Sequence, residues 1–97
     1  MRVEYHPSTV TDLNRAIEFY NRQRPGLGAE CRDAVYDAIN QLQETPMRYR
    51  IVESDVRRCF VRRFPFSILY RVIDDEVVRI LVIRHHRQRS EFGQSRR

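Results

Sequence analysis

The stretch "FSILYRVIDDEVVRILVIR", residues 66–84, decides the fold of this chain. Its two halves, 66–73 and 77–84, are rich in β-branched and aromatic residues, which favour strands. The acidic "DDE" between them is typical of a tight hairpin connection. Both halves are apolar at nearly every position, so we expect two central strands that are covered on one face.

Strands are also predicted on either side of this hairpin in the chain. The segment "VRRCFVRRF", residues 56–64, has the same β-branched and aromatic character and ends before Pro65. Two shorter strands are expected at "RIV", residues 50–52, and at "RVEY", residues 2–5. Most of the sheet therefore lies in the C-terminal half of the chain.

Two amphipathic helices separate the first strand from the others. Apolar residues recur at steps of three and four in both segments, which predicts helices over 9–23 and 27–44. The connecting "RPGLG", residues 24–28, breaks the first helix and lets the chain reverse. The predicted fold is α+β: an N-terminal strand, a two-helix hairpin, then a three- to four-stranded antiparallel sheet packed on the hairpin.

Length and composition indicate one ordinary globular domain. The chain has 97 residues, of which 41% are hydrophobic and 32% charged. We expect a single domain over 1–97, with a flexible basic tail from about 90 to 97. No apolar run is long enough to span a bilayer, so a cytoplasmic location without membrane contact is expected.

The charge is carried by arginine alone. All eighteen basic residues are arginine, and the net charge is +5. Arginine grips phosphate or carboxylate with two hydrogen bonds, which favours a nucleic acid or an acidic protein as partner. The two cysteines form no CxxC pair and read as buried thiols, and the three histidines have no ligand cluster beside them. No metal and no organic cofactor is expected.

Several segments together resemble the RelE/ParE family of toxins from bacterial toxin–antitoxin (plasmid stabilisation) modules. The resemblance covers essentially the whole chain and depends on the order of its parts rather than on any one of them. These parts are "DL..AI.FY" from Asp12 to Tyr20, "RPGLGAE" with "AI..L...P" through Pro46, "VRR.FVRRFPFSILYRV" at 56–72, and "ILVIRHHRQR" at 80–89.

The resemblance implies a small basic toxin that inhibits growth until its cognate antitoxin binds it. The antitoxin is expected to be acidic, encoded next to the toxin, and assembled with it as a hetero-oligomer. The resemblance allows two targets: the ParE-like branch poisons DNA gyrase, and the RelE-like branch cuts messenger RNA on the ribosome without a metal.

The nuclease pattern of the RelE-like branch is incomplete in this sequence. Arg87 falls where those nucleases keep an arginine, but Ser67 stands where they often hold another. Their C-terminal tyrosine falls at Phe92 or Gly93, neither of which can transfer a proton. If the chain is a ribonuclease, its catalytic candidates are His86, Arg87 and Arg58. We favour gyrase poisoning, with an endoribonuclease and an inactive antitoxin-binding module as alternatives.

Arginine doublets and aromatic residues are the candidates for binding the antitoxin or the target. Strand alternation over 56–64 predicts that Arg58 and Arg62 share one face and that Arg57 and Arg63 share the other. It also places His85 and His86 on opposite faces. A general RNA-binding domain is the weaker reading, because the sheet lacks a pair of stacking aromatics. The binding candidates are Arg57, Arg58, Arg62, Arg63, Arg87, Arg89, Phe19, Tyr20 and Tyr36.

Overall fold

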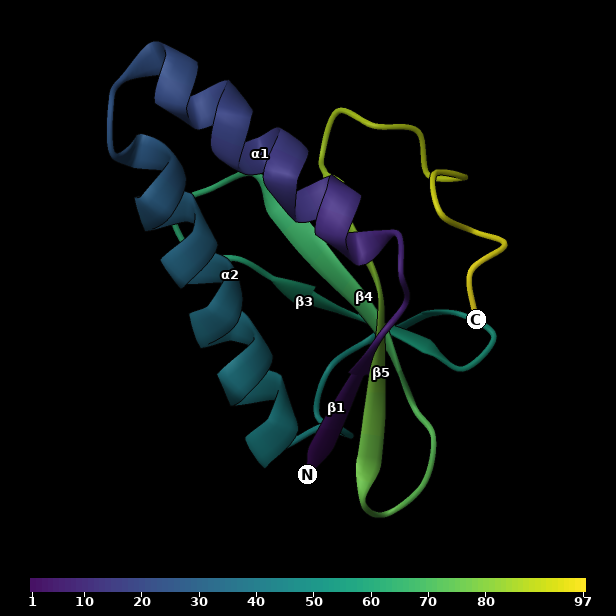
Figure 1. Ribbon diagram of the computed structural model, residues 1–97. Helices are drawn as coiled ribbons and strands as arrows, with labels where there is room; N and C mark the ends of the chain where they lie inside the picture. The colour runs from purple at the N-terminus through teal and green to yellow at the C-terminus, as the bar shows by residue number, and fades with distance from the viewer.

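A helical hairpin packs on one face of a five-stranded sheet, so the molecule has two layers (Figure 1). The computed structural model describes all residues, 1–97. Neither helix is long and apolar enough to cross a membrane. The elements in chain order are β1 (Arg2–Tyr5), α1 (Thr9–Gln23), α2 (Leu27–Glu44), β2 (Ile51–Glu53), β3 (Val56–Phe60), β4 (Phe66–Val72) and β5 (Val77–His85).

The β4–β5 hairpin lies at the centre of the sheet, as its continuous apolar sequence predicts. The strand order is β1-β5-β4-β3-β2, and all pairs are antiparallel except β1 with β5, which run parallel. The predicted α+β fold is confirmed, and both helices have the predicted bounds. The sequence did not indicate that the N-terminal strand would join the same sheet at its far edge.

Strand β3 is shorter than the predicted strand over 56–64. It ends at Phe60, and Val61–Pro65 form a turn closed by the Val61 N–H, which donates to the Phe66 carbonyl at 2.9 Å. Arg63 has a φ of 72° in this turn, a left-handed conformation that a strand does not contain. The predicted alternation of the second arginine doublet is therefore wrong, because the pleat stops before it.

The main core lies between the hairpin and the sheet. Ala16 and Tyr20 of α1 pack with the α2 stripe and with alternate residues of the strands. Tyr70 is fully buried at the centre, and its hydroxyl donates to the Pro46 carbonyl at 2.6 Å. Both cysteines are buried thiols, and burial raises the pKa of Cys31 to about 11. The prediction of two buried thiols is therefore confirmed.

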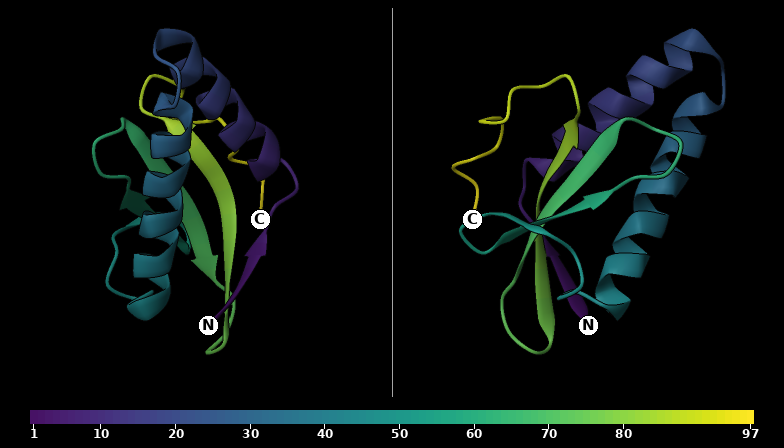
Figure 2. Two further views of the ribbon diagram at one scale, coloured as in Figure 1. Left: turned by 60° about the vertical axis from the view of Figure 1, so that its left-hand side comes forward. Right: turned by 180° about the vertical axis from the view of Figure 1, so that it is seen from behind.

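The chain after β5 turns back onto the second face of the sheet, away from the helices. Phe92 packs there against Leu69, Leu81 and Val82. Figure 2 shows this last segment in yellow, beside the sheet and apart from α2. A flexible tail was predicted from about residue 90. Its flexibility stays a prediction, but the structure gives the tail contacts with the sheet.

Candidate functional site

Four side chains gather on the second face of the sheet and form what we call the second-face cluster: Arg58, Phe60, Ser67 and His86. Arg58 and Phe60 are alternate residues of β3, and Ser67 of β4 lies opposite Phe60 in the strand pair. His86 follows β5 directly, and its backbone N–H donates to the Pro65 carbonyl at 2.8 Å. Strand pairing thus brings together residues from three separate segments.

Contacts within the second-face cluster fix the imidazole of His86. Its Nε2 lies 3.0 Å from Ser67 Oγ, and its ring lies edge-on to Phe60 with centroids 5.6 Å apart. The Arg58 guanidinium lies over the Phe60 ring at 4.6 Å, and Arg58 Nε is buried without a hydrogen-bond partner. Ser67 is only 2% exposed, so its hydroxyl orients the imidazole and cannot reach a bound substrate.

The predicted nuclease residues are not all brought together. His86 and Arg58 belong to the same cluster, but Arg87 lies on the helix side, where it lines a pocket with Arg15 and Phe19 of α1. His85 lies on the helix side as well, edge-on to Phe66 with centroids 5.0 Å apart. The prediction that the two histidines point to opposite faces is confirmed.

The other arginines of the two doublets have separate surroundings. Arg57 donates from Nη1 to the carbonyls of Met47 and Tyr49 at 3.0 and 2.7 Å, so it holds the chain that follows α2. Arg63 forms an ion pair with Glu30 at 3.1 Å. This contact, and a second one from Arg24, lower the pKa of the Glu30 carboxyl.

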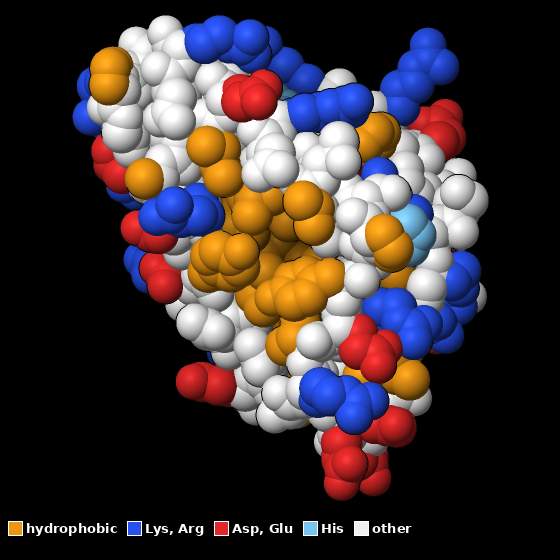
Figure 3. All heavy atoms as spheres, viewed as in Figure 1, with side chains coloured by type: hydrophobic (Ala, Val, Ile, Leu, Met, Phe, Trp, Pro, Cys, Tyr) orange, Lys and Arg blue, Asp and Glu red, His pale blue; other side chains and the backbone are white.

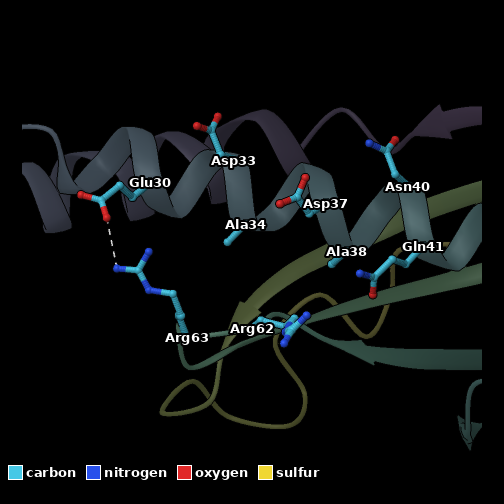
Figure 4. A pocket seen from close by; sticks show the side chains of 9 residues that line it. All are labelled: Glu30, Asp33, Ala34, Asp37, Ala38, Asn40, Gln41, Arg62 and Arg63. Carbon is cyan, nitrogen blue, oxygen red and sulfur yellow. Dashed lines mark hydrogen bonds and ion pairs between the residues drawn. The ribbon is translucent and has the colours of Figure 1, made fainter.

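Arg62 and Arg63 line a polar cleft of about 630 Å³ between α2 and the β3–β4 turn. Figure 4 shows Glu30, Asp33 and Asp37 along the α2 side of this cleft, with both arginines below them. The Arg62 side chain has no hydrogen bond or ion pair, whereas Arg63 is engaged with Glu30. Arg89 is exposed and lies in the segment that follows β5.

The three aromatic binding candidates, Phe19, Tyr20 and Tyr36, lie in different surroundings. Tyr20, one of the predicted binding residues, is 8% exposed and packs edge-on against Phe64 with centroids 5.0 Å apart, so it presents almost no surface to a partner. Its ring completes the core where the hairpin meets the β3–β4 turn. Phe19 is 46% and Tyr36 44% exposed, but they face different cavities.

Tyr36 belongs to an apolar groove between the two helices, called here the interhelical groove. The groove has a volume of about 240 Å³ and appears in Figure 3 as a hollowed hydrophobic patch. Its lining includes Tyr5, Val10, Leu13, Val35 and Tyr36. Tyr5 and Val10 were missed as binding candidates. Val10 lies three residues before Leu13 on α1, and this spacing is the sequence signal that could have pointed to it.

No three side chains of His, Cys, Asp or Glu lie close enough together to hold a metal ion. The chemistry open to the second-face cluster is that of one imidazole, one guanidinium and one exposed ring. Such a set can bind an anion or a flat group. A proton could enter or leave it only through His86.

Comparisons with known proteins identify the family. The family described as "ParE toxin of type II toxin-antitoxin system, parDE" matches residues 3–90. The fold is similar to a solved structure titled "Chromosomal ParDE TA system from P. aeruginosa", with a TM-score of 0.77 and 22% sequence identity over 88% of this chain and 95% of that one. No curated protein matches the chain. Because the family match spans almost the whole chain, from β1 to beyond β5, this protein belongs to the ParE toxin family of type II toxin–antitoxin systems.

Proposed function

We propose that this toxin arrests growth by binding DNA gyrase and does not cut messenger RNA. The observation that carries the proposal is the composition of the second-face cluster. Cleavage of RNA needs one group to take the proton of the 2′-hydroxyl and another to return a proton to the leaving oxygen. The cluster offers His86 alone, because Ser67 is buried and Arg87 lies on the other side of the sheet.

The family match supports the same choice of target. It is to the ParE family, the branch with which the resemblance associates gyrase. The cluster is then a surface for contact: an exposed Phe60 ring beneath a guanidinium, held in place by a fixed imidazole.

Expression of the chain without an antitoxin tests this proposal. We expect growth arrest with trapped gyrase–DNA breaks and with intact messenger RNA, since the cluster lacks a second proton-transfer group. Mapping of RNA ends and recovery of gyrase-linked DNA from the same cells provide the measurement. The matched variants are His86→Gln and, as a histidine control outside the cluster, His6→Gln.

Two results would contradict the proposal in different ways. RNA ends spaced by codons that disappear in His86→Gln but persist in His6→Gln would make the cluster a ribonuclease site. Normal growth on expression of the wild-type chain would leave an inactive antitoxin-binding module, provided that the folded protein is present in the cells.

We further propose that an amphipathic helix of an acidic antitoxin fills the interhelical groove, so that toxin and antitoxin assemble as a hetero-oligomer. The groove leaves Val10 62% and Tyr36 44% exposed, which is an apolar surface without a partner in the chain. The net charge of +5 would attract the acidic side chains of the same partner.

Charge placed in the groove should weaken this binding. Val10→Glu and Tyr36→Glu are each expected to weaken antitoxin affinity at least about 30-fold, because each leaves a carboxylate buried without a partner. Isothermal titration with the antitoxin encoded beside the toxin measures the effect. Phe60→Glu is the matched control, since Phe60 is 58% exposed on the opposite face. Equal losses in all three variants would remove the groove from the interface.

A further inference from the structure

A second cavity lies between α1 and the chain that leaves β5, and nothing in the toxin function described above uses it. This cavity, called here the α1–β5 pocket, has a volume of about 320 Å³. Its apolar lining consists of Ala16, Phe19, Phe66, Ile83 and Phe92. Phe66 and Ile83 are buried and form the floor, whereas Phe19 is 46% exposed at the rim. The pocket is therefore a concave aromatic site that is open on one side.

The polar groups of the α1–β5 pocket are Asp12, Arg15, His85, Arg87 and Gln88. The guanidinium groups of Arg15 and Arg87 lie at the pocket without a hydrogen bond or an ion pair to any other side chain. Asp12 is the only acid, and both of its oxygens are already bound by Arg96 at 2.6 and 3.3 Å. The two free arginines are thus not neutralised from within the pocket.

The remaining groups also present donors. His85 Nδ1 accepts the Arg87 backbone N–H at 3.0 Å, so its proton lies on Nε2. Burial, with Arg87 and His86 nearby, lowers the pKa of His85, so the ring is neutral at pH 7. Gln88 Oε1 accepts the His85 backbone N–H at 2.9 Å, and the Gln88 amide NH₂ is free to donate. Every polar group that is free to meet a ligand is therefore a hydrogen-bond donor.

We propose that the α1–β5 pocket binds a single nucleotide unit, with the phosphate on Arg15 and Arg87 and the base against Phe19 and Phe92. A terminal phosphate carries three acceptor oxygens and two charges, and it satisfies four donor groups better than the two oxygens of a carboxylate. The exposed Phe19 ring supplies a face on which a base stacks, and the half-buried Phe92 ring lines the same pocket. The volume lies at the small end of ligand pockets, which limits the ligand to one unit.

The same ligand chemistry has two sources: a free nucleoside monophosphate, or the phosphorylated 5′ end of a nucleic-acid strand. Both would place a phosphomonoester on the arginines and a base on the rings. This inference goes beyond the gyrase proposal and does not depend on it, because binding is measured on the purified protein without any growth readout.

Titration of the purified full-length chain tests the proposal. The probes are a nucleoside 5′-monophosphate, the corresponding nucleoside, inorganic phosphate, and one short single-stranded oligonucleotide with and without its 5′ phosphate. We expect the monophosphate to bind more tightly than the nucleoside or inorganic phosphate, because only it engages both the arginines and the rings. A phosphorylated strand that binds more tightly than the free monophosphate would assign the site to strand ends, and the reverse order would assign it to free nucleotides.

Matched variants locate the binding. Arg15→Ala and Arg87→Ala should each weaken the monophosphate about tenfold, since each removes a charge-assisted hydrogen bond. Arg22→Ala is the control for charge, because Arg22 is exposed on the same helix but outside the pocket. For the rings, Phe19→Ala is paired with Tyr36→Ala, which removes a similarly exposed ring from the interhelical groove.

Three results would overturn the proposal. The first is the absence of saturable binding of the monophosphate. The second is a loss in Arg22→Ala equal to that in Arg15→Ala, which would mean attraction to the net positive charge alone. The third is an affinity for the nucleoside equal to that for the monophosphate, which would mean that the arginines do not hold the phosphate.

Discussion

Replacing Asp12 by alanine should lower the free energy of unfolding by about 3 to 5 kcal/mol, the range for breaking a buried ion pair. The Asp12 side chain is 2% exposed and pairs with Arg96, whose side chain is 14% exposed. The carboxylate also accepts the backbone N–H of Ile83 at 3.1 Å. The variant therefore leaves a buried N–H without a partner, and it leaves a nearly buried guanidinium whose remaining hydrogen-bond acceptor is the Leu81 carbonyl. Urea unfolding followed by circular dichroism measures the change.

Two controls show which contact of Asp12 matters. Asp33→Ala removes an acid whose side chain is 68% exposed and paired only with the adjacent Arg32, so it should change stability by less than about 1 kcal/mol. Arg96→Met removes the ion pair but keeps the Asp12–Ile83 bond. A cost for Asp12→Ala below that of Asp33→Ala would show that α1, β5 and the tail are not joined through this carboxylate.

Asp12 also shows where prediction from sequence stops. The sequence places it in the first turn of a helix that begins at Thr9, and the structure agrees. Its partners, however, are 71 and 84 residues away. Local periodicity fixes which face of a helix is buried, but it cannot say which backbone N–H or which guanidinium will meet a polar side chain on that face.

The candidate site residues show the same limit of prediction from sequence. Alternation placed His85 and His86 on opposite faces, because β5 keeps its pleat through His85 and His86 follows it directly. It failed for Arg62 and Arg63, because the turn after Phe60 ends the strand. The spacing of Val10 and Leu13 could have pointed to an apolar surface on α1, but nothing in the sequence shows that this surface lines a groove or that Arg15 is free of partners. Both facts depend on how α1 is placed against its neighbours.

Replacing Gly28 by valine should lower the free energy of unfolding by about 3 kcal/mol, at the upper end of the cost of overpacking. A Cβ at this buried position would clash with the Ile17 carbonyl oxygen and lie 2.7 Å from the Asn21 side chain. The Gly28 N–H also donates to Asn21 Oδ1 at 2.8 Å, so the backbone of α2 contacts a side chain of α1 here. Because the carbonyl of α1 cannot give way, the helices must separate. Urea unfolding measures the loss of stability.

Gly26 gives the matched control for this prediction. It has a φ of 90°, but a Cβ there would meet nothing within 4 Å. Gly26→Ala should therefore cost about 1 to 2 kcal/mol through backbone strain alone and leave the helix packing unchanged. Antitoxin affinity separates the two cases, because the interhelical groove is formed by both helices and changes shape only when they separate. Antitoxin affinity reduced in Gly28→Val and retained in Gly26→Ala is the expected pair of results. Unchanged affinity in both Gly28→Val and Gly26→Ala would show that antitoxin binding does not depend on the spacing of α1 and α2.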